Sequence, residues 1–91
     1  MMTFKQLLLL QLAEEACEIG QACSKVIRFG DTERLKDDLK KEITDLLATI
    51  DLLNDHGFDF KLSCENINLK KDKILKYHKE SMGLNLVQPI P

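Results

Sequence analysis

The stretch "KVIRFGDTERL", residues 25–35, decides the fold, because it joins two helical patterns through a tight turn. Gly30 suits the position just after a helix, where the backbone often turns left-handed and glycine does so without a steric cost. Asp31 or Thr32 can cap the helix that follows, and Glu33 in its first turn complements the helix dipole. A connection this short makes the two helices antiparallel neighbours.

Helical signals extend from this turn in both directions. The upstream helix begins at a capping box, in which Thr3 and Gln6 satisfy each other's backbone N–H groups. The downstream helix ends near Gly57, and a shorter third helix opens near Ser63 and ends at Gly83. The pattern predicts an all-α fold, a compact antiparallel helical bundle of two long helices plus a shorter third.

Length and composition favour one small soluble domain. The chain has 91 residues, of which 44% are hydrophobic and 31% are charged. We expect the domain to cover residues 1–83, and residues 84–91, which hold both prolines, to form an extended tail. A domain of this size buries only about 60–65% of its unfolded surface, so it often depends on a partner subunit.

Charge and cysteine content exclude several classes of protein. A net charge of −2 gives no overall basic field for nucleic acid. The apolar run at 7–10 is too short for a membrane span and lacks the layout of a signal peptide. Cys17, Cys23 and Cys64 form no CxxC pair, which argues against a disulfide framework or a zinc ribbon. We expect buried, reduced thiols in a cytoplasmic protein that binds neither membrane nor nucleic acid.

Each long helix places one glutamate in the middle of its apolar stripe. On the first helix, Glu15 interrupts a run of apolar residues three or four apart, namely Phe4, Leu8, Leu12, Ile19, Ala22 and Val26. On the second helix, Glu42 interrupts a similar stripe of Leu35, Leu39, Leu46, Ile50 and Leu53. An alternative course for the second stripe passes through Ile43 in place of Glu42.

Each of these glutamates has an acidic companion one turn further on. Glu18 follows Glu15, and Asp45 follows Glu42, at the i,i+3 spacing that puts two side chains on one helix face. In an antiparallel pair the two levels differ by about 6 Å along the helix axes, so the two pairs of carboxylates can face each other. Four ionised carboxylates in a partly buried site repel one another unless positive charge lies among them.

A divalent cation is the simplest source of that charge. Neither stripe carries Lys or Arg at this level, and an all-oxygen, carboxylate-rich site suits Mg²⁺, for which Mn²⁺ can substitute. Magnesium in proteins usually bridges to a substrate phosphate. The alternative is a set of ordinary solvated carboxylates, because 15 of the 91 residues are acidic.

The acidic residues also resemble a known signature. The segments "EEACE" at 14–18 and "EITD" at 42–45 are similar to the EExxE…ExxD motif of the MazG-like, all-α nucleoside triphosphate pyrophosphohydrolases. The resemblance covers residues 4–56 well and the third helix more loosely, and it points to the short single-domain members of phages and bacteria. It implies a helical bundle completed by dimerisation, or by pairing of dimers, and hydrolysis of a (d)NTP to the monophosphate and pyrophosphate.

The resemblance also implies roles for individual residues. Glu15, Glu18, Glu42 and Asp45 would be the metal ligands and form the catalytic site, with one of them orienting the attacking water. Glu14 matches the first acid of the motif, but it lies off the apolar stripe, where a solvated position is expected.

Basic residues are needed to hold the rest of the triphosphate. The candidates for substrate binding lie beyond the acids on the first helix and on the third helix: Lys25, Arg28, Lys73 and Lys76. Their alternative role is that of plain solvated surface, which is common for lysines on a polar helix. Because the sequence has no GxGxxG or GxxxxGK[ST] loop, nucleotide binding must go through metal and helix side chains.

Two other interpretations stay open. A phosphoribosyl-ATP pyrophosphohydrolase shares the fold and the acids, but the histidine expected just after the ExxD motif is absent, since "LLATIDLL" follows Asp45. A non-enzymatic helical dimerisation or interaction module would carry the acids on its surface and use the stripes as a dimer seam. The sequence leaves open the preferred base and sugar and the number of metal ions.

Overall fold

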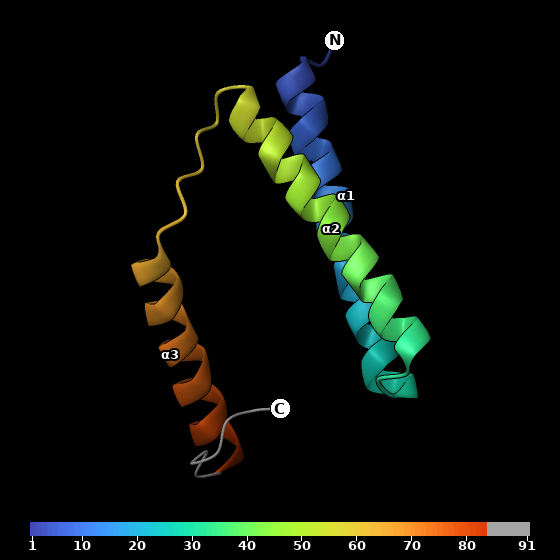
Figure 1. Ribbon diagram of the computed structural model, residues 1–91, viewed down its shortest axis with the longest axis vertical. Coiled ribbons are helices and arrows are strands. Elements are labelled where there is room, and N and C mark those ends of the chain that lie inside the picture. Colours follow the sequence, from blue (N-terminus) through green and yellow to red (C-terminus); the bar gives the residue numbers. More distant parts are fainter. Residues whose placement is uncertain (84–91) are drawn as a thin grey trace. The chain divides into compact units, whose positions relative to one another are not determined.

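The computed structural model describes residues 1–83, which form three helices and no strands. These are α1 (Phe4–Phe29), α2 (Glu33–Asp55) and α3 (Cys64–Met82) (Figure 1). The prediction of an all-α fold is therefore confirmed for the described part of the chain. The predicted extended tail, residues 84–91, lies outside the described residues.

The chain divides into two compact units, Met1–Phe60 and the segment from Lys61 onward. The expectation of a single domain over residues 1–83 stays a prediction. Between positions 1 and 83, no helix combines the length and the apolar content that crossing a membrane requires.

The predicted caps define the ends of α1. The Thr3 hydroxyl accepts from the Gln6 backbone N–H at 3.1 Å, and the Gln6 side-chain oxygen accepts from the Thr3 backbone N–H at 2.8 Å. This reciprocal pair is the expected capping box. At the other end, Gly30 has a φ of 91° and its N–H donates to the Val26 carbonyl at 2.9 Å. Glycine is needed there because a side chain would strain a backbone with positive φ.

Threonine 32, and not Asp31, caps α2. The Thr32 hydroxyl accepts from the Leu35 backbone N–H at 3.3 Å. His56 occupies the C-cap of the same helix, with its ring Nδ1 2.9 Å from the Leu52 carbonyl oxygen. The ring of Phe4 lies 4.8 Å from the His56 ring, centroid to centroid, so the start of α1 meets the end of α2. The two helices are therefore antiparallel neighbours, as expected, and lie side by side in Figure 1.

The packed seam between α1 and α2 follows the predicted stripes. The buried apolar side chains all belong to them: Leu8, Ala22, Leu35 and Leu53. Glu15 is as buried as these leucines, and the alternative residue Ile43 is 40% exposed, so the second stripe passes through Glu42. The prediction fails at Phe4, which is 55% exposed because it lies at the open end of the hairpin.

The expectation of buried cysteines is wrong for all three. Cys17, Cys23 and Cys64 are exposed free thiols. The reason is geometric: Cys17 and Cys23 lie off the α1 stripe, and Cys64 is the first residue of α3.

The second unit contains α3, which Ser63 caps through a hydrogen bond from the Asn66 backbone N–H. Gly83, with a φ of 63°, ends the helix in the left-handed conformation, as predicted. No residue of α3 is buried. Its large apolar residues are all exposed: Ile67, Leu69, Ile74, Leu75, Tyr77 and Met82.

Candidate metal centre

Three of the four predicted acids meet halfway along the α1–α2 seam. Glu15 and Glu18 come from α1 and Glu42 comes from α2, and one carboxylate oxygen from each lies within 4.8 Å of the other two. The meeting follows from the sequence, because the i,i+3 spacing puts Glu15 and Glu18 on one face and the short turn brings Glu42 opposite them.

Glu15 is the most unusual member of this cluster. Its side chain is only 6% exposed, and one of its oxygens accepts from the Gln11 side-chain N–H at 2.6 Å. The other oxygen, Oε2, is buried without any hydrogen-bond partner. The Oε2 atom of Glu42 is buried and unpartnered in the same way. Such oxygens destabilise the metal-free fold, because burial removes their hydration and no protein hydrogen bond replaces it.

The electrostatics of the cluster are dominated by repulsion. The pKa of Glu18 is raised above its ordinary value, first because protonated Glu18 can donate a hydrogen bond to Glu42. The negative charges of Glu42 and Glu15 raise that pKa further, with smaller contributions from burial and from Asp45. No Lys or Arg in residues 1–83 forms an ion pair with the three glutamates. Within the described residues the three glutamates are therefore not neutralised by an ion pair.

Asp45, the fourth predicted ligand, is near the cluster but not part of it. Its side chain is exposed, and its carboxylate is not among the oxygens that converge. Its charge still reaches Glu18, where it contributes to the raised pKa. The role of Asp45 as a ligand stays a prediction.

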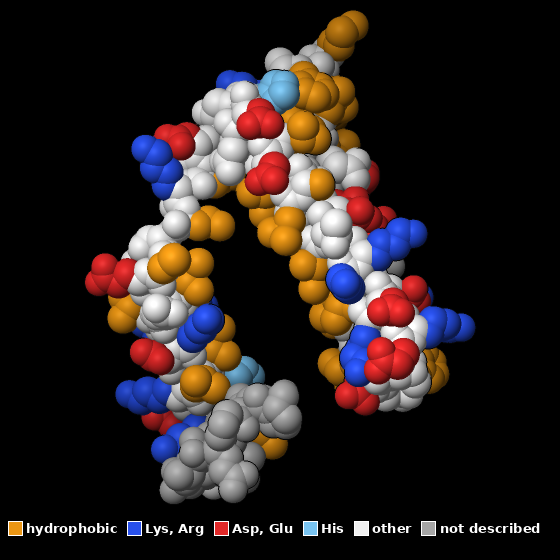
Figure 2. Space-filling model, in the orientation of Figure 1, with side chains coloured by type: hydrophobic (Ala, Val, Ile, Leu, Met, Phe, Trp, Pro, Cys, Tyr) orange, Lys and Arg blue, Asp and Glu red, His pale blue; other side chains and the backbone are white. Residues whose placement is uncertain are grey.

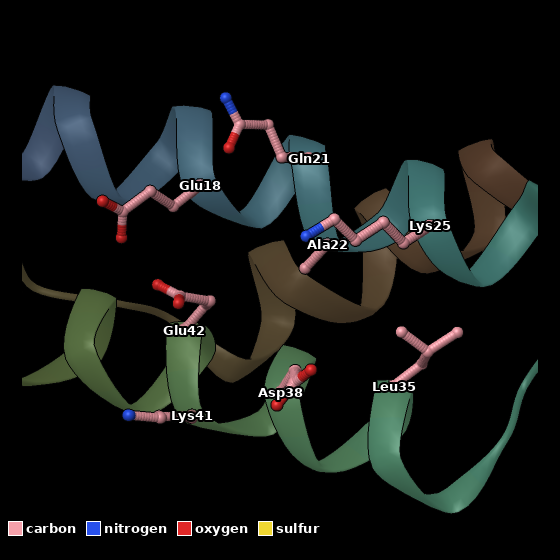
Figure 3. Close-up of a pocket in the computed structure, with 8 residues that line it drawn as sticks. All are labelled: Glu18, Gln21, Ala22, Lys25, Leu35, Asp38, Lys41 and Glu42. Carbon is pink, nitrogen blue, oxygen red and sulfur yellow. The ribbon is translucent and has the colours of Figure 1, made fainter.

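A cleft of about 330 Å³ opens directly beside the cluster. Glu18 and Glu42 form part of its wall, and the other lining residues continue along both helices toward the turn (Figure 3): Gln21, Ala22, Lys25, Leu35, Asp38 and Lys41. Lys25 is thus the one predicted basic residue that lines this space.

The other predicted basic residues are placed differently. The guanidinium of Arg28 rests over the ring of Phe29, 5.0 Å from its centroid, and does not line the cleft. Lys73 and Lys76 are exposed on α3, in the second unit of the chain. Their proposed contact with substrate stays a prediction.

Four residues of this region were missed by the sequence reasoning. Gln11 precedes Glu15 by four residues, and Asp38 precedes Glu42 by four; Gln21 follows Glu18 by three, and Lys41 adjoins Glu42. The i,i+3 and i,i+4 relations could have indicated the first three, because they place these residues on the same faces as the acids.

The donor set fits a hard divalent cation. The converging atoms are carboxylate oxygens, no thiol or imidazole takes part, and Glu15 and Glu42 each have one buried, unpartnered oxygen. Mg²⁺ and Mn²⁺ prefer such ligands, and Mg²⁺ completes its coordination with water. Glu18 is exposed and Glu42 is partly exposed, so one side of the cluster is open to solvent.

Comparisons with protein-family models, with curated proteins and with solved structures found no match to this chain.

Proposed function

We propose that this chain is a metal-dependent nucleotide pyrophosphohydrolase, which cleaves a (d)NTP to the (d)NMP and pyrophosphate. The observation that carries the proposal is the buried carboxylate of Glu15, which has one unpartnered oxygen and converges with the carboxylates of Glu18 and Glu42. A fold retains such an unfavourable group where it serves a function, and a cation is the natural partner for it.

The roles follow from the chemistry of the donor set. Glu15, Glu18 and Glu42 would hold Mg²⁺, with Asp45 as the further ligand that the resemblance implies. When bound, the metal neutralises phosphate charge and lowers the pKa of a coordinated water. One of the carboxylates orients the attacking water toward the α-phosphorus. A bond from the water oxygen to the α-phosphorus forms, the bond to the bridging oxygen breaks, its electron pair leaves with pyrophosphate, and the proton passes to solvent.

A homodimer, or a pair of dimers, is part of the same proposal. The first unit buries only four apolar side chains, and many large ones stay exposed along α1 and α2 (Figure 2), among them Leu7, Leu10, Leu47 and Leu52. Exposed apolar surface in this amount supports an interface with another chain. The same surface favours the second candidate function, a helical interaction module without catalytic activity.

One experiment separates the two candidates. The protein is incubated with each NTP and dNTP and Mg²⁺, and the products are separated to detect monophosphate and pyrophosphate. Turnover that disappears in Glu42→Gln, and persists in Asp51→Asn as a matched exposed acid on α2, supports the hydrolase. If the intact, folded protein releases no pyrophosphate from any nucleotide, the hydrolase proposal is wrong and the interaction module is the candidate that remains.

A further inference from the structure

We propose that the cleft beside the three glutamates is the subsite for the pyrophosphate half of the substrate, with Lys25 and Lys41 as its cationic side chains. This inference rests on the proposed hydrolase function and adds a direction to it. The α-phosphate would lie at the glutamates, and the two leaving phosphates would extend from there toward the α1–α2 turn.

The position of the cleft gives this direction. It shares Glu18 and Glu42 with the candidate metal centre and then continues past Ala22 and Asp38 to Lys25. Lys25 is seven residues beyond Glu18, which is about 10 Å along the helix axis. A chain of phosphates that begins at the metal centre therefore has one continuous path along the seam (Figure 3).

Two lysines of the cleft supply positive charge close to the glutamates. Lys25 lies over the cleft with its amine on the side of Glu18 and Glu42, and Lys41 lies at the edge of the cleft on α2, beside Glu42, with its amine pointing away from Lys25 (Figure 3). Neither lysine forms an ion pair within residues 1–83, so both amines are available to an incoming anion. Gln21 adds an uncharged amide that can donate a hydrogen bond.

A second hollow adds positive charge near the α1–α2 turn. It is lined by Lys25 and Leu35, which it shares with the cleft, and by Phe29, Thr32 and Arg34. Arg34 and the N-terminal end of α2 both add positive potential beyond Lys25. The terminal phosphate, which carries the most negative charge, is therefore best stabilised at this end.

The lining also excludes the nucleoside half from this cleft. None of its lining residues is aromatic, and its apolar part is limited to Ala22 and Leu35. A base needs a flat apolar surface for stacking, whereas a pyrophosphate needs cations and hydrogen-bond donors. The volume of about 330 Å³ is at the small end of the range for ligand sites. Asp38 is the one lining acid on this part of the path, and it opposes anion binding there.

Inorganic pyrophosphate is the probe that tests the subsite. Its affinity is measured by titration calorimetry in the presence of Mn²⁺, for the wild type and for Lys25→Gln, Lys41→Gln and Asp38→Asn. Lys25→Gln is expected to weaken pyrophosphate about tenfold, as the loss of one charge-assisted hydrogen bond does, and Lys41→Gln to weaken it less. Asp38→Asn is expected to tighten it several-fold, because a repelling charge is removed. Lys40→Gln, an exposed lysine outside the cleft, is the matched control and leaves the affinity unchanged.

A second ligand makes the result specific. The affinity for a nucleoside monophosphate is measured with the same variants, and Lys25→Gln is expected to leave it unchanged. Equal losses for both ligands, or an unchanged pyrophosphate affinity in Lys25→Gln, would overturn the subsite. A weaker pyrophosphate affinity in Asp38→Asn would also overturn the subsite, because it would indicate that Asp38 binds the metal and does not repel the anion.

Failure of the subsite is distinguishable from failure of the hydrolase. If the wild type cleaves nucleotides and Lys25→Gln keeps the same KM and the same inhibition by pyrophosphate, only the subsite is wrong. If the wild type neither binds Mn²⁺ nor cleaves any nucleotide, the hydrolase and the subsite fall together.

Discussion

Glu15 combines burial, one short hydrogen bond and one unpartnered oxygen in a single side chain. We predict that Glu15→Leu makes the metal-free protein more stable, by about 0.5–2 kcal/mol, as is common when a strained functional group is replaced. The same variant should lose the rise in melting temperature that Mn²⁺ gives to the wild type through binding to the folded state. Urea and thermal unfolding with Mn²⁺ or EDTA measure both effects.

Glu14 provides the matched control for this prediction. It is the adjacent glutamate, it is exposed, and it lies off the α1 stripe. Glu14→Leu should change the metal-free stability less than Glu15→Leu does, and it should leave the stabilisation by Mn²⁺ unchanged. An equal Mn²⁺ response in wild type and Glu15→Leu would contradict the metal site.

Gln11 is predicted to act through Glu15. Its side-chain N–H is the hydrogen-bond donor to the carboxylate, at 2.6 Å, so Gln11→Leu leaves a buried charge without its partner. The expected loss is about 1–3 kcal/mol of metal-free stability, read from urea unfolding. In a Glu15→Leu background the same substitution should cost almost nothing, because the interaction is already gone. Additive losses in this double-mutant cycle would show that Gln11 acts independently.

The raised pKa of Glu18 predicts a pH dependence of the metal-free protein. A carboxyl whose pKa is higher in the folded state than in the unfolded state favours folding only while it is protonated. Its contribution is fully present below the ordinary pKa of 4.5 and is lost as the pH rises through the raised value. Glu18→Gln, which stays neutral, should therefore raise the melting temperature near neutral pH, with a gain that vanishes below pH 4.5. A gain of the same size at every pH contradicts the repulsion among the glutamates.

Helical periodicity predicted which acids enter the seam, but it did not predict their hydrogen bonds. The 3.6-residue period separates Glu15 from Glu14 correctly, and it places Glu42 inward. The contact of Gln11 and the outward position of the Asp45 carboxylate depend on side-chain rotamers, which a residue pattern does not specify.

At the scale of the helices, Leu53 fixes how α2 packs on α1. Leu53 is fully buried, whereas its neighbour Leu52 is 45% exposed. Leu53→Ala should cost about 2–5 kcal/mol, because the cavity it leaves at the seam cannot be refilled. Leu52→Ala removes the same atoms from the surface and should cost much less. Urea unfolding of both variants measures the difference, and equal losses would mean that the seam runs elsewhere.

The ends of the helices were predictable because they depend on local chemistry. Thr3 with Gln6, Gly30 and Ser63 each satisfy or end a helix through contacts within a few residues. The exposure of Phe4 was not predictable in this way, since it depends on how far the partner helix extends and not on the stripe itself.

At the scale of the whole molecule, amphipathic patterns predicted that α3 forms, but they do not identify its partner. The second unit by itself buries no residue of α3, and packing of an apolar face is what normally stabilises a helix. A pattern within one helix carries no information about the surface that covers it, and the same holds for the exposed apolar side chains of α1 and α2.

The proposed homodimer gives the last prediction. A unit with four buried apolar side chains has a small core, and binding of a second copy would add stability that depends on concentration. We therefore expect the melting temperature to rise with protein concentration and light scattering to give twice the chain mass. Leu47→Lys, which puts a charge on the exposed apolar surface of α2, should lower the mass to that of one chain. Lys40→Gln, also exposed on α2, is the control and should leave the dimer intact. A monomeric wild type whose melting temperature is independent of concentration would contradict the dimer while leaving the glutamate cluster, which lies within one chain, untouched.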